Sequence, residues 1–144
     1  MRYLILVAAV LGVTACQQKA DIDIPTARTR AALTLTAFEC SQLAPSPADS
    51  SRLFNVGLDA GRDFLAFQEK NSSGYRSLAP SLDPAWSSTE ARPSADFRLG
   101  ELYSASSLRV DEMRGRWNDR EWQERRTALY EQRNCAFIGV PAKK

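Results

Sequence analysis

Residues 53–67, Leu-Phe-Asn-Val-Gly-Leu-Asp-Ala-Gly-Arg-Asp-Phe-Leu-Ala-Phe, form the predicted second helix of the chain. Its small and apolar residues recur at the three- and four-residue spacing of one helical face. The residues on that face are Leu53, Val56, Gly57, Ala60, Phe64 and Phe67. Charged residues interrupt the apolar run, so this helix is not a membrane dimerisation motif. We expect its N-cap at Asp49 or Ser50.

Two glycines in this helix need a physical reason. Gly57 and Gly61 are four residues apart, and each costs about 1 kcal/mol relative to alanine in a helix interior. We expect another helix to approach closely over this small-residue surface. The alternative is that a ligand or a partner's backbone presses there.

A preceding helix is predicted from Pro25 to about Leu43, because proline fits a first helical turn and Asp23 or Thr26 can cap it. Its inward positions are Leu33, Ala37, Cys40 and Ala44. The helix should end before residues 44–47, since the residue before each proline there disfavours helical backbone.

Two further helices are predicted in the C-terminal half. One begins after a Ser94 cap and continues towards Trp117. The other begins at Asn118, where Glu121 completes a pattern that resembles a capping box. Gly115 and Asn118 therefore mark a break between the two helices.

Residues 71–93 show neither helical nor strand periodicity and carry three prolines. Loops of this length are usually functional or disordered. Tyr75, Leu78, Leu82 and Trp86 make this one too apolar for an ordinary flexible linker. We expect it to lie on the helices as an ordered cover, and the alternative is a binding loop that presents Trp86 or Tyr75.

Cysteine usage predicts one disulfide. The chain has three cysteines, and the first, Cys16, ends the export-signal-like segment described in the next paragraph, where it is expected to carry lipid. Cys40 and Cys135 then remain as a pair in an exported chain, where oxidation is expected. Closing so long a loop should stabilise the fold by about 4 to 5 kcal/mol. The competing interpretation is a reactive or metal-binding thiol pair. The predicted fold is all-α, a small four-helix array with a long ordered loop between the second and third helices, closed by one disulfide.

Residues 1–16 have the composition of an export signal, with one basic residue, an apolar core and small residues before Cys16. The segment 13–16, Val-Thr-Ala-Cys, resembles the lipobox of bacterial lipoproteins, which implies cleavage after residue 15 and acylation of Cys16, with palmitate as a typical acyl chain. The alternative is an ordinary secreted protein with an incidental cysteine. Gln17 stands where aspartate would resemble an inner-membrane retention signal, so we expect an outer-membrane protein that faces the periplasm.

This resemblance divides the chain into a signal peptide (1–15), a tether (16–24) and a helical domain (25–144). Stable anchoring takes two or more acyl chains. The eight residues from Gln17 to Ile24 reach at most about 26 to 29 Å when extended. A partner should therefore lie in or near the same membrane.

The composition excludes several kinds of chemistry. The chain has 19 basic, 17 acidic and no histidine residues. Without histidine there is no Ser-His or Cys-His nucleophile and no mixed histidine metal site, and near-neutral charge gives no reason to expect nucleic acid. The sequence predicts neither a cofactor nor a metal.

One acid remains as a catalytic candidate. Glu39-Cys40-Ser41 resembles the Glu-Ser pair of lytic transglycosylases, although a cysteine separates the two residues here. This resemblance implies an acid–base role for Glu39 on peptidoglycan. The alternative is a solvated or ion-paired helix glutamate.

Arginine and tryptophan residues alternate between positions 114 and 126. Arginine stacks on aromatic rings and pairs with carboxylates or phosphates, so this segment could bind lipid headgroups or an acidic protein surface. Alternating acidic residues make a solvated, ion-paired helix face the other interpretation. Together with the loop, the partner-binding candidates are Tyr75, Trp86, Trp117, Trp122, Arg125 and Arg126.

The pattern of Phe38-Glu39-Cys40-Ser41, Arg52-Leu53-Phe54, Gly61-Arg62 and Asn134-Cys135 resembles that of small bacterial envelope lipoproteins. The resemblance implies a helical, disulfide-closed body. We expect a non-enzymatic, lipid-anchored protein that binds another envelope protein as an accessory, pilot or scaffold. The alternatives are a lipoprotein that excludes phage or plasmids or inhibits a cell-wall hydrolase, and a peptidoglycan-acting enzyme that uses Glu39.

Overall fold

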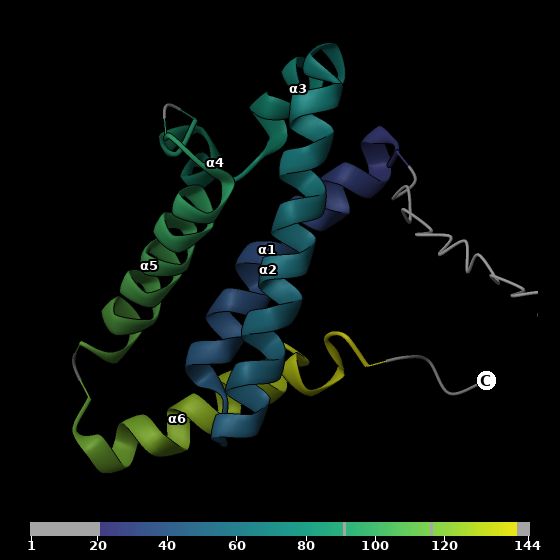
Figure 1. Ribbon diagram of the computed structural model, residues 1–144. Helices are drawn as coiled ribbons and strands as arrows, with labels where there is room; N and C mark the ends of the chain where they lie inside the picture. Colours follow the sequence, from purple (N-terminus) through teal and green to yellow (C-terminus); the bar gives the residue numbers. More distant parts are fainter. Residues whose placement is uncertain (1–20, 91, 116, 141–144) are drawn as a thin grey trace, which may run out of the picture.

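The computed structural model describes residues 21–90, 92–115 and 117–140 (Figure 1). Within these residues the chain is helical and has no strand. The elements are α1 (Ile24–Leu43), α2 (Pro47–Lys70), α3 (Ser72–Leu78), η1 (Ala79–Ser81), α4 (Pro84–Ser88), α5 (Ala95–Arg114), α6 (Asp119–Gln132) and η2 (Cys135–Phe137). The all-α prediction is confirmed. The expected signal peptide and Cys16 lie outside the described residues.

Local capping sets where the long helices begin. Asp23 caps α1 and accepts a hydrogen bond from the Thr26 backbone nitrogen at 2.9 Å, as predicted. The predicted cap of α2 is wrong, since Ser46 rather than Asp49 or Ser50 is the N-cap. Pro47 fits the first turn, where no N–H is needed, and this lets the helix begin three residues earlier.

The caps of the two C-terminal helices are confirmed. Ser94 accepts from the Phe97 backbone nitrogen at 3.2 Å and begins α5. Asn118 and Glu121 form a complete capping box at the start of α6. The chain turns between the two helices at Gly115, which is the C-cap of α5.

The described residues of the segment 71–93 are ordered as predicted, but they do not form the structureless loop that the missing periodicity indicated. Asn71 caps α3 by accepting from the Gly74 nitrogen, and Asp83 caps α4 by accepting from the Ala85 nitrogen. These helices have seven and five residues, which is too short to display a helical period in the sequence. Leu78 and Trp86 are buried, so the segment does cover the long helices.

The two glycines of α2 lie at helix–helix contacts, which confirms the first interpretation of their spacing. A Cβ on Gly57 would come within 2.5 Å of the Phe38 ring of α1. A Cβ on Gly61 would overlap Leu99 of α5 and contact Thr34 of α1. The glycines therefore let α1 and α5 pack directly onto α2.

The core has two clusters joined along α1. The larger lies beneath α3 and α4 and includes Phe38, Phe64 and Trp86. The smaller lies where α6 crosses the ends of α1 and α2, and it contains the predicted disulfide between Cys40 and Cys135, whose Cα atoms are 5.6 Å apart. The one-disulfide prediction is confirmed. None of the described helices has the length and hydropathy needed to cross a bilayer.

Candidate functional site

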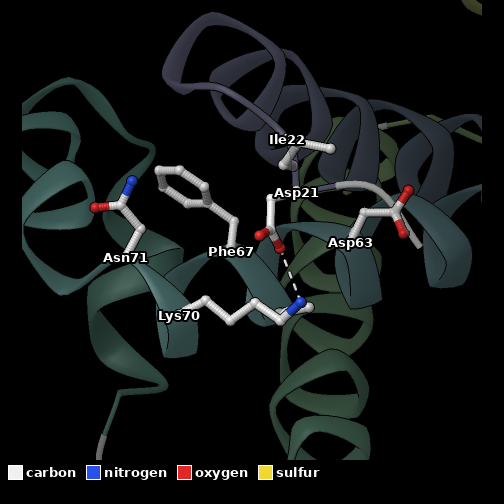
Figure 2. Close-up of a pocket in the computed structure, with 7 residues that line it drawn as sticks. Asp21, Ile22, Asp63, Phe67, Lys70 and Asn71 are labelled. Atoms are coloured by element: carbon white, nitrogen blue, oxygen red, sulfur yellow. Dashed lines mark hydrogen bonds and ion pairs between the residues drawn. The ribbon is translucent and has the colours of Figure 1, made fainter. Parts of the chain in front are cut away.

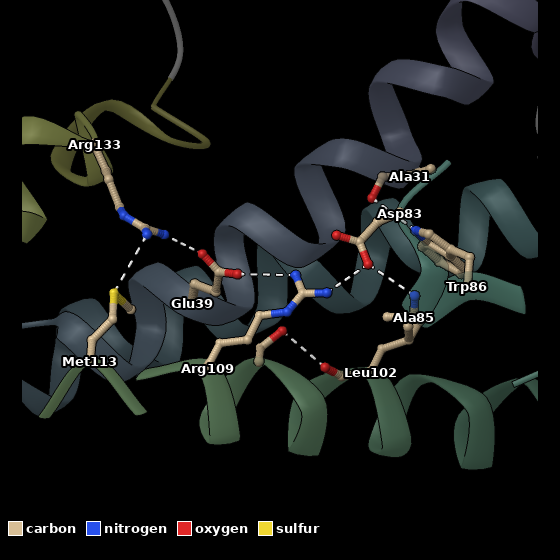
Figure 3. Close-up of polar contacts among 10 residues, drawn as sticks. Ala31, Glu39, Asp83, Ala85, Trp86, Leu102, Arg109, Met113 and Arg133 are labelled. Carbon is tan, nitrogen blue, oxygen red and sulfur yellow. Dashed lines mark hydrogen bonds and ion pairs between the residues drawn. The ribbon is translucent and has the colours of Figure 1, made fainter. Parts of the chain in front are cut away.

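Trp86 lies in the core rather than on a binding loop. Its side chain is only 1% exposed, and its ring packs edge-on against Phe64 with 4.5 Å between centroids. The indole nitrogen donates a hydrogen bond to the Ala31 carbonyl of α1 at 3.3 Å (Figure 3). The structure therefore corrects the prediction of Trp86 as a partner-binding residue, because its whole surface is used to hold α4 on α1.

Tyr75 is half-buried beside the same cluster. Its ring contacts Phe64, with 6.1 Å between centroids, and its hydroxyl donates a hydrogen bond to Glu90. Burial, followed by the hydrogen bond to Glu90, raises the pKa of Tyr75 to about 12. Tyr75 joins α3 to the residues after α4 and presents little free surface to a partner.

The four predicted binding residues around α6 do not gather on one surface. Trp122 is buried in the smaller cluster, which contradicts its predicted role at an interface, and Arg126 is half-buried. Trp117 is 43% exposed, and the Arg125 guanidinium lies over its ring at 4.9 Å. Of these four residues, Trp117 and Arg125 therefore form an exposed aromatic and basic pair.

Glu39 lies at the centre of an ion-pair network that joins four helices (Figure 3). Its largely buried carboxylate accepts hydrogen bonds from Arg109 of α5 and from Arg133, the C-cap of α6. Arg109 also donates to Asp83, the N-cap of α4, at 2.6 Å. Both oxygens of Glu39 are thus bound by arginines. This agrees with the alternative interpretation from the sequence, an ion-paired helix glutamate, rather than with a free acid.

A groove with a volume of about 480 Å³ lies between α2 and α5. We call it the α2–α5 groove. Its apolar lining consists of Phe54, Leu58, Leu99 and Tyr103. At one end Arg62 and Asp96 form an ion pair at 3.3 Å, and at the other end lie Ser50 and Ser51. The groove is therefore apolar along its length and polar at both ends.

Two exposed apolar side chains, Phe97 and Leu108, form a stripe on the outer face of α5 next to this groove. Phe97 and Leu108 are 51% and 63% exposed and lie eleven residues apart, which is three helical turns, so they share one face of α5. Gly100 lines the groove beside this stripe, and a Cβ built there meets nothing within 4 Å. Phe97 is three residues from Gly100 and so borders the groove, whereas Leu108 lies further along the outer face of α5.

Sequence reasoning missed this surface, although a signal for it was present. The inward face of α5 has Leu99, Leu102, Ser106 and Val110. Phe97 and Leu108 fall on a different face of the same helix, where a solvent-exposed helix would normally carry polar residues. A second apolar face on α5 could have been recognised from this spacing.

A smaller pocket of about 220 Å³ lies where the chain enters the body (Figure 2). Asp21 accepts a hydrogen bond from Lys70, the last residue of α2, at 2.8 Å. Ile22 packs against the larger core cluster, and Phe67 lines the same pocket. Residues 21–24 of the predicted tether therefore belong to the folded body.

No group of three metal-ligating side chains occurs among residues 21–90, 92–115 and 117–140. Comparison of the chain with protein-family models, curated proteins and solved structures found no match. The candidate site is therefore defined by its geometry alone.

Proposed function

We propose that this chain is a non-enzymatic, lipid-anchored protein of the bacterial cell envelope that binds another envelope protein through the α2–α5 groove. The observation that carries the proposal is the apolar α2–α5 groove, with the exposed Phe97 at its border and Leu108 further along the outer face of α5. Large apolar side chains with half or more of their surface in water, next to an apolar groove, are typical of protein-binding surfaces.

The lipobox-like segment and the start of the folded body support the membrane part of the proposal. Five residue steps separate Cys16 from Asp21, and fully extended chain covers at most about 18 Å over that distance. A body held this closely meets partners that are embedded in the membrane or lie on it. An accessory, pilot or scaffold role agrees with such a position.

The shape of the groove favours a helical segment as the bound element. From Ser51 to Arg62 the lining of α2 extends over about 16 Å, which is three turns of helix. An amphipathic helix places apolar side chains at this spacing and can lie in such a groove. We therefore propose that the partner inserts the apolar face of a helix between α2 and α5, with its flank against Leu108.

Glu39 does not support the enzymatic alternative as well as the groove supports binding. A general acid needs a carboxyl group that is free to give a proton to substrate. Arg109 and Arg133 occupy both oxygens of Glu39. This arrangement favours a structural role for Glu39, because its ion pairs with Arg109 and Arg133 account for a carboxylate at this position without a substrate.

A crosslinking experiment in the native envelope tests the proposal. A photoreactive residue at position 108 should capture a discrete partner, whereas one at position 128, on an exposed part of α6, should not. Equal capture at both positions, or none at 108, would refute the groove as the binding site. The captured protein also separates the proposed role from exclusion of phage or plasmids and from inhibition of a hydrolase.

The anchor has its own test. Palmitate labelling should be lost in Cys16→Ser. Labelling that is unchanged in this variant would refute the lipid anchor, whatever the crosslinking shows.

A further inference from the structure

Phe137 is the most exposed large apolar side chain in the described part of the molecule, at 74%, yet it is held firmly. It lies two residues after Cys135, whose disulfide joins it to α1. The next residue, Ile138, packs on the smaller cluster, and its carbonyl accepts a hydrogen bond from Arg52 of α2. The fold thus fixes in place an apolar side chain that it leaves in water.

The turn that follows is fixed as well. Gly139 has a φ of 72°, a backbone conformation that favours glycine, and its α-carbon lies so close to Val56 that a Cβ would meet that side chain at 2.5 Å. Val140 follows and is 52% exposed. Two apolar side chains therefore project from one short, well-anchored segment.

A shallow groove of about 640 Å³ separates this segment from α1. Ala32 and Leu33 of α1 line it on one side, and Phe137 and Ile138 line it on the other. Arg28 and Arg133 are also in the lining, which includes no carboxylate. Arg133 is ion-paired with Glu39, so this face is mainly apolar and its positive charge rests on Arg28.

This face extends along α1, from Arg28 near the end from which the proposed anchor extends to the C-terminal turn, which the disulfide holds at Cys40. Arg28 is in the second turn of α1, and Ile24, the first residue of that helix, is also exposed. The chain from Cys16 to Asp21 reaches at most about 18 Å when fully extended. A folded body of this size has a radius of gyration of about 14 Å. The body cannot move far from the bilayer, so one of its faces must lie near the lipid surface.

From these observations we infer that the face formed by Arg28, Phe137 and Val140 lies on the surface of an anionic phospholipid bilayer. This inference rests on the lipid anchor of the proposed function. Phe137 and Val140 enter the interface between headgroups and acyl chains, and Arg28 approaches the phosphates. In Figure 1 the C-terminal turn and α5 lie on opposite sides of α1 and α2, so the α2–α5 groove stays open to a partner.

Contact quenching of tryptophan fluorescence by brominated phospholipid tests this orientation. The full-length lipidated protein is reconstituted into vesicles of phosphatidylethanolamine and phosphatidylglycerol, with the wild-type signal subtracted. Phe137→Trp should be quenched strongly and the matched control Leu108→Trp, on α5, should not be. Val140→Trp provides a second probe at the same face. All three positions are at least half exposed, so these substitutions should not disturb folding.

A charge variant tests the phosphate contact. In the Phe137→Trp background, Arg28→Gln should lower the ratio of quenched to unquenched tryptophan, which reports protein with this face on the bilayer, about fivefold. A basic residue near an anionic surface contributes about 1 kcal/mol. Replacing phosphatidylglycerol by a zwitterionic lipid should have the same effect.

The outcomes separate this inference from the proposed function. Protein that does not float with the vesicles would refute the anchor and this inference together. Protein that floats, with equal quenching at positions 137 and 108, would refute only the inference. Crosslinking of position 137 to another protein, without quenching, would show a protein interface instead and would also overturn it.

Discussion

The indole nitrogen of Trp86 donates a hydrogen bond to the Ala31 carbonyl at 3.3 Å and so joins residues that are 55 positions apart in the chain. The tryptophan is in a five-residue helix that could not be stable alone, because isolated helices shorter than about 12 residues are marginal in water. Its burial on α1 supplies the stability that α4 lacks. The segment that resembled a loop in the sequence is therefore part of the core.

Replacing Trp86 should destabilise the whole body. Trp86→Ala leaves a large cavity between α1, α2 and α4, and such changes cost about 3–5 kcal/mol. Trp117→Ala, which removes an exposed tryptophan, should cost no more than about 1 kcal/mol. Urea denaturation followed by circular dichroism measures both. Equal stability of the two variants would contradict the core role of Trp86.

The glycines of α2 and α5 provide an internal comparison. Gly61→Ala should destabilise the fold by about 1–3 kcal/mol, because the added methyl group overlaps Leu99. Gly100→Ala meets no neighbour and should instead stabilise α5 by up to about 1 kcal/mol. The two midpoints of urea unfolding should move in opposite directions. A stabilising Gly61→Ala would mean that the two helices do not pack as described.

The disulfide should make a large contribution to stability. Cys40 and Cys135 are separated by 95 positions, and the chain-entropy model gives about 4 to 5 kcal/mol for a loop of that length. Unfolding of the Cys40→Ala, Cys135→Ala double variant should show this loss. Reducing agent should destabilise the wild type by a similar amount and leave the double variant unchanged. An effect of reducing agent on the double variant would contradict this explanation.

Acid should weaken the link between α4 and α5. The hydrogen bond from Arg109 lowers the pKa of the Asp83 carboxyl below its ordinary value of 3.8, although partial burial opposes this shift. The stabilisation is therefore complete above pH 3.8 and decreases as the pH falls through the lowered pKa. The difference in unfolding free energy between wild type and Asp83→Asn should be constant above that pH and shrink below it. A difference that grows on acidification would contradict the ion pair between Asp83 and Arg109.

Alkali should act on Tyr75 with the opposite sign. Its pKa is raised from 10.0 to about 12, so its contribution to stability is present below pH 10 and is lost as the pH rises towards 12. Spectroscopic titration of the phenolates should show a late-ionising component that is lost in Tyr75→Phe. Glu90→Gln should lower this pKa only in part, because burial is the larger cause. Complete return to 10.0 would assign the shift to Glu90 alone.

Features that depend on neighbours along the chain could be predicted from the sequence. The four long helices followed from apolar spacing, and Asp23, Ser94 and the Asn118–Glu121 pair could be recognised as caps, because these signals act within one turn. The disulfide followed from counting cysteines. Even the error at the start of α2 was local, since Pro47 offered an earlier cap at Ser46.

Which large side chains are covered depends on tertiary packing and could not be predicted from the sequence. Trp86 and Trp122 are buried, whereas Phe97, Leu108 and Phe137 are exposed, although nothing in their hydropathy separates the two groups. Burial depends on which helix arrives from elsewhere in the chain, and neither spacing nor capping carries that information. The α2–α5 groove and the surface around Phe137 exist because α5 and the C-terminal turn pack on opposite sides of the α1–α2 pair.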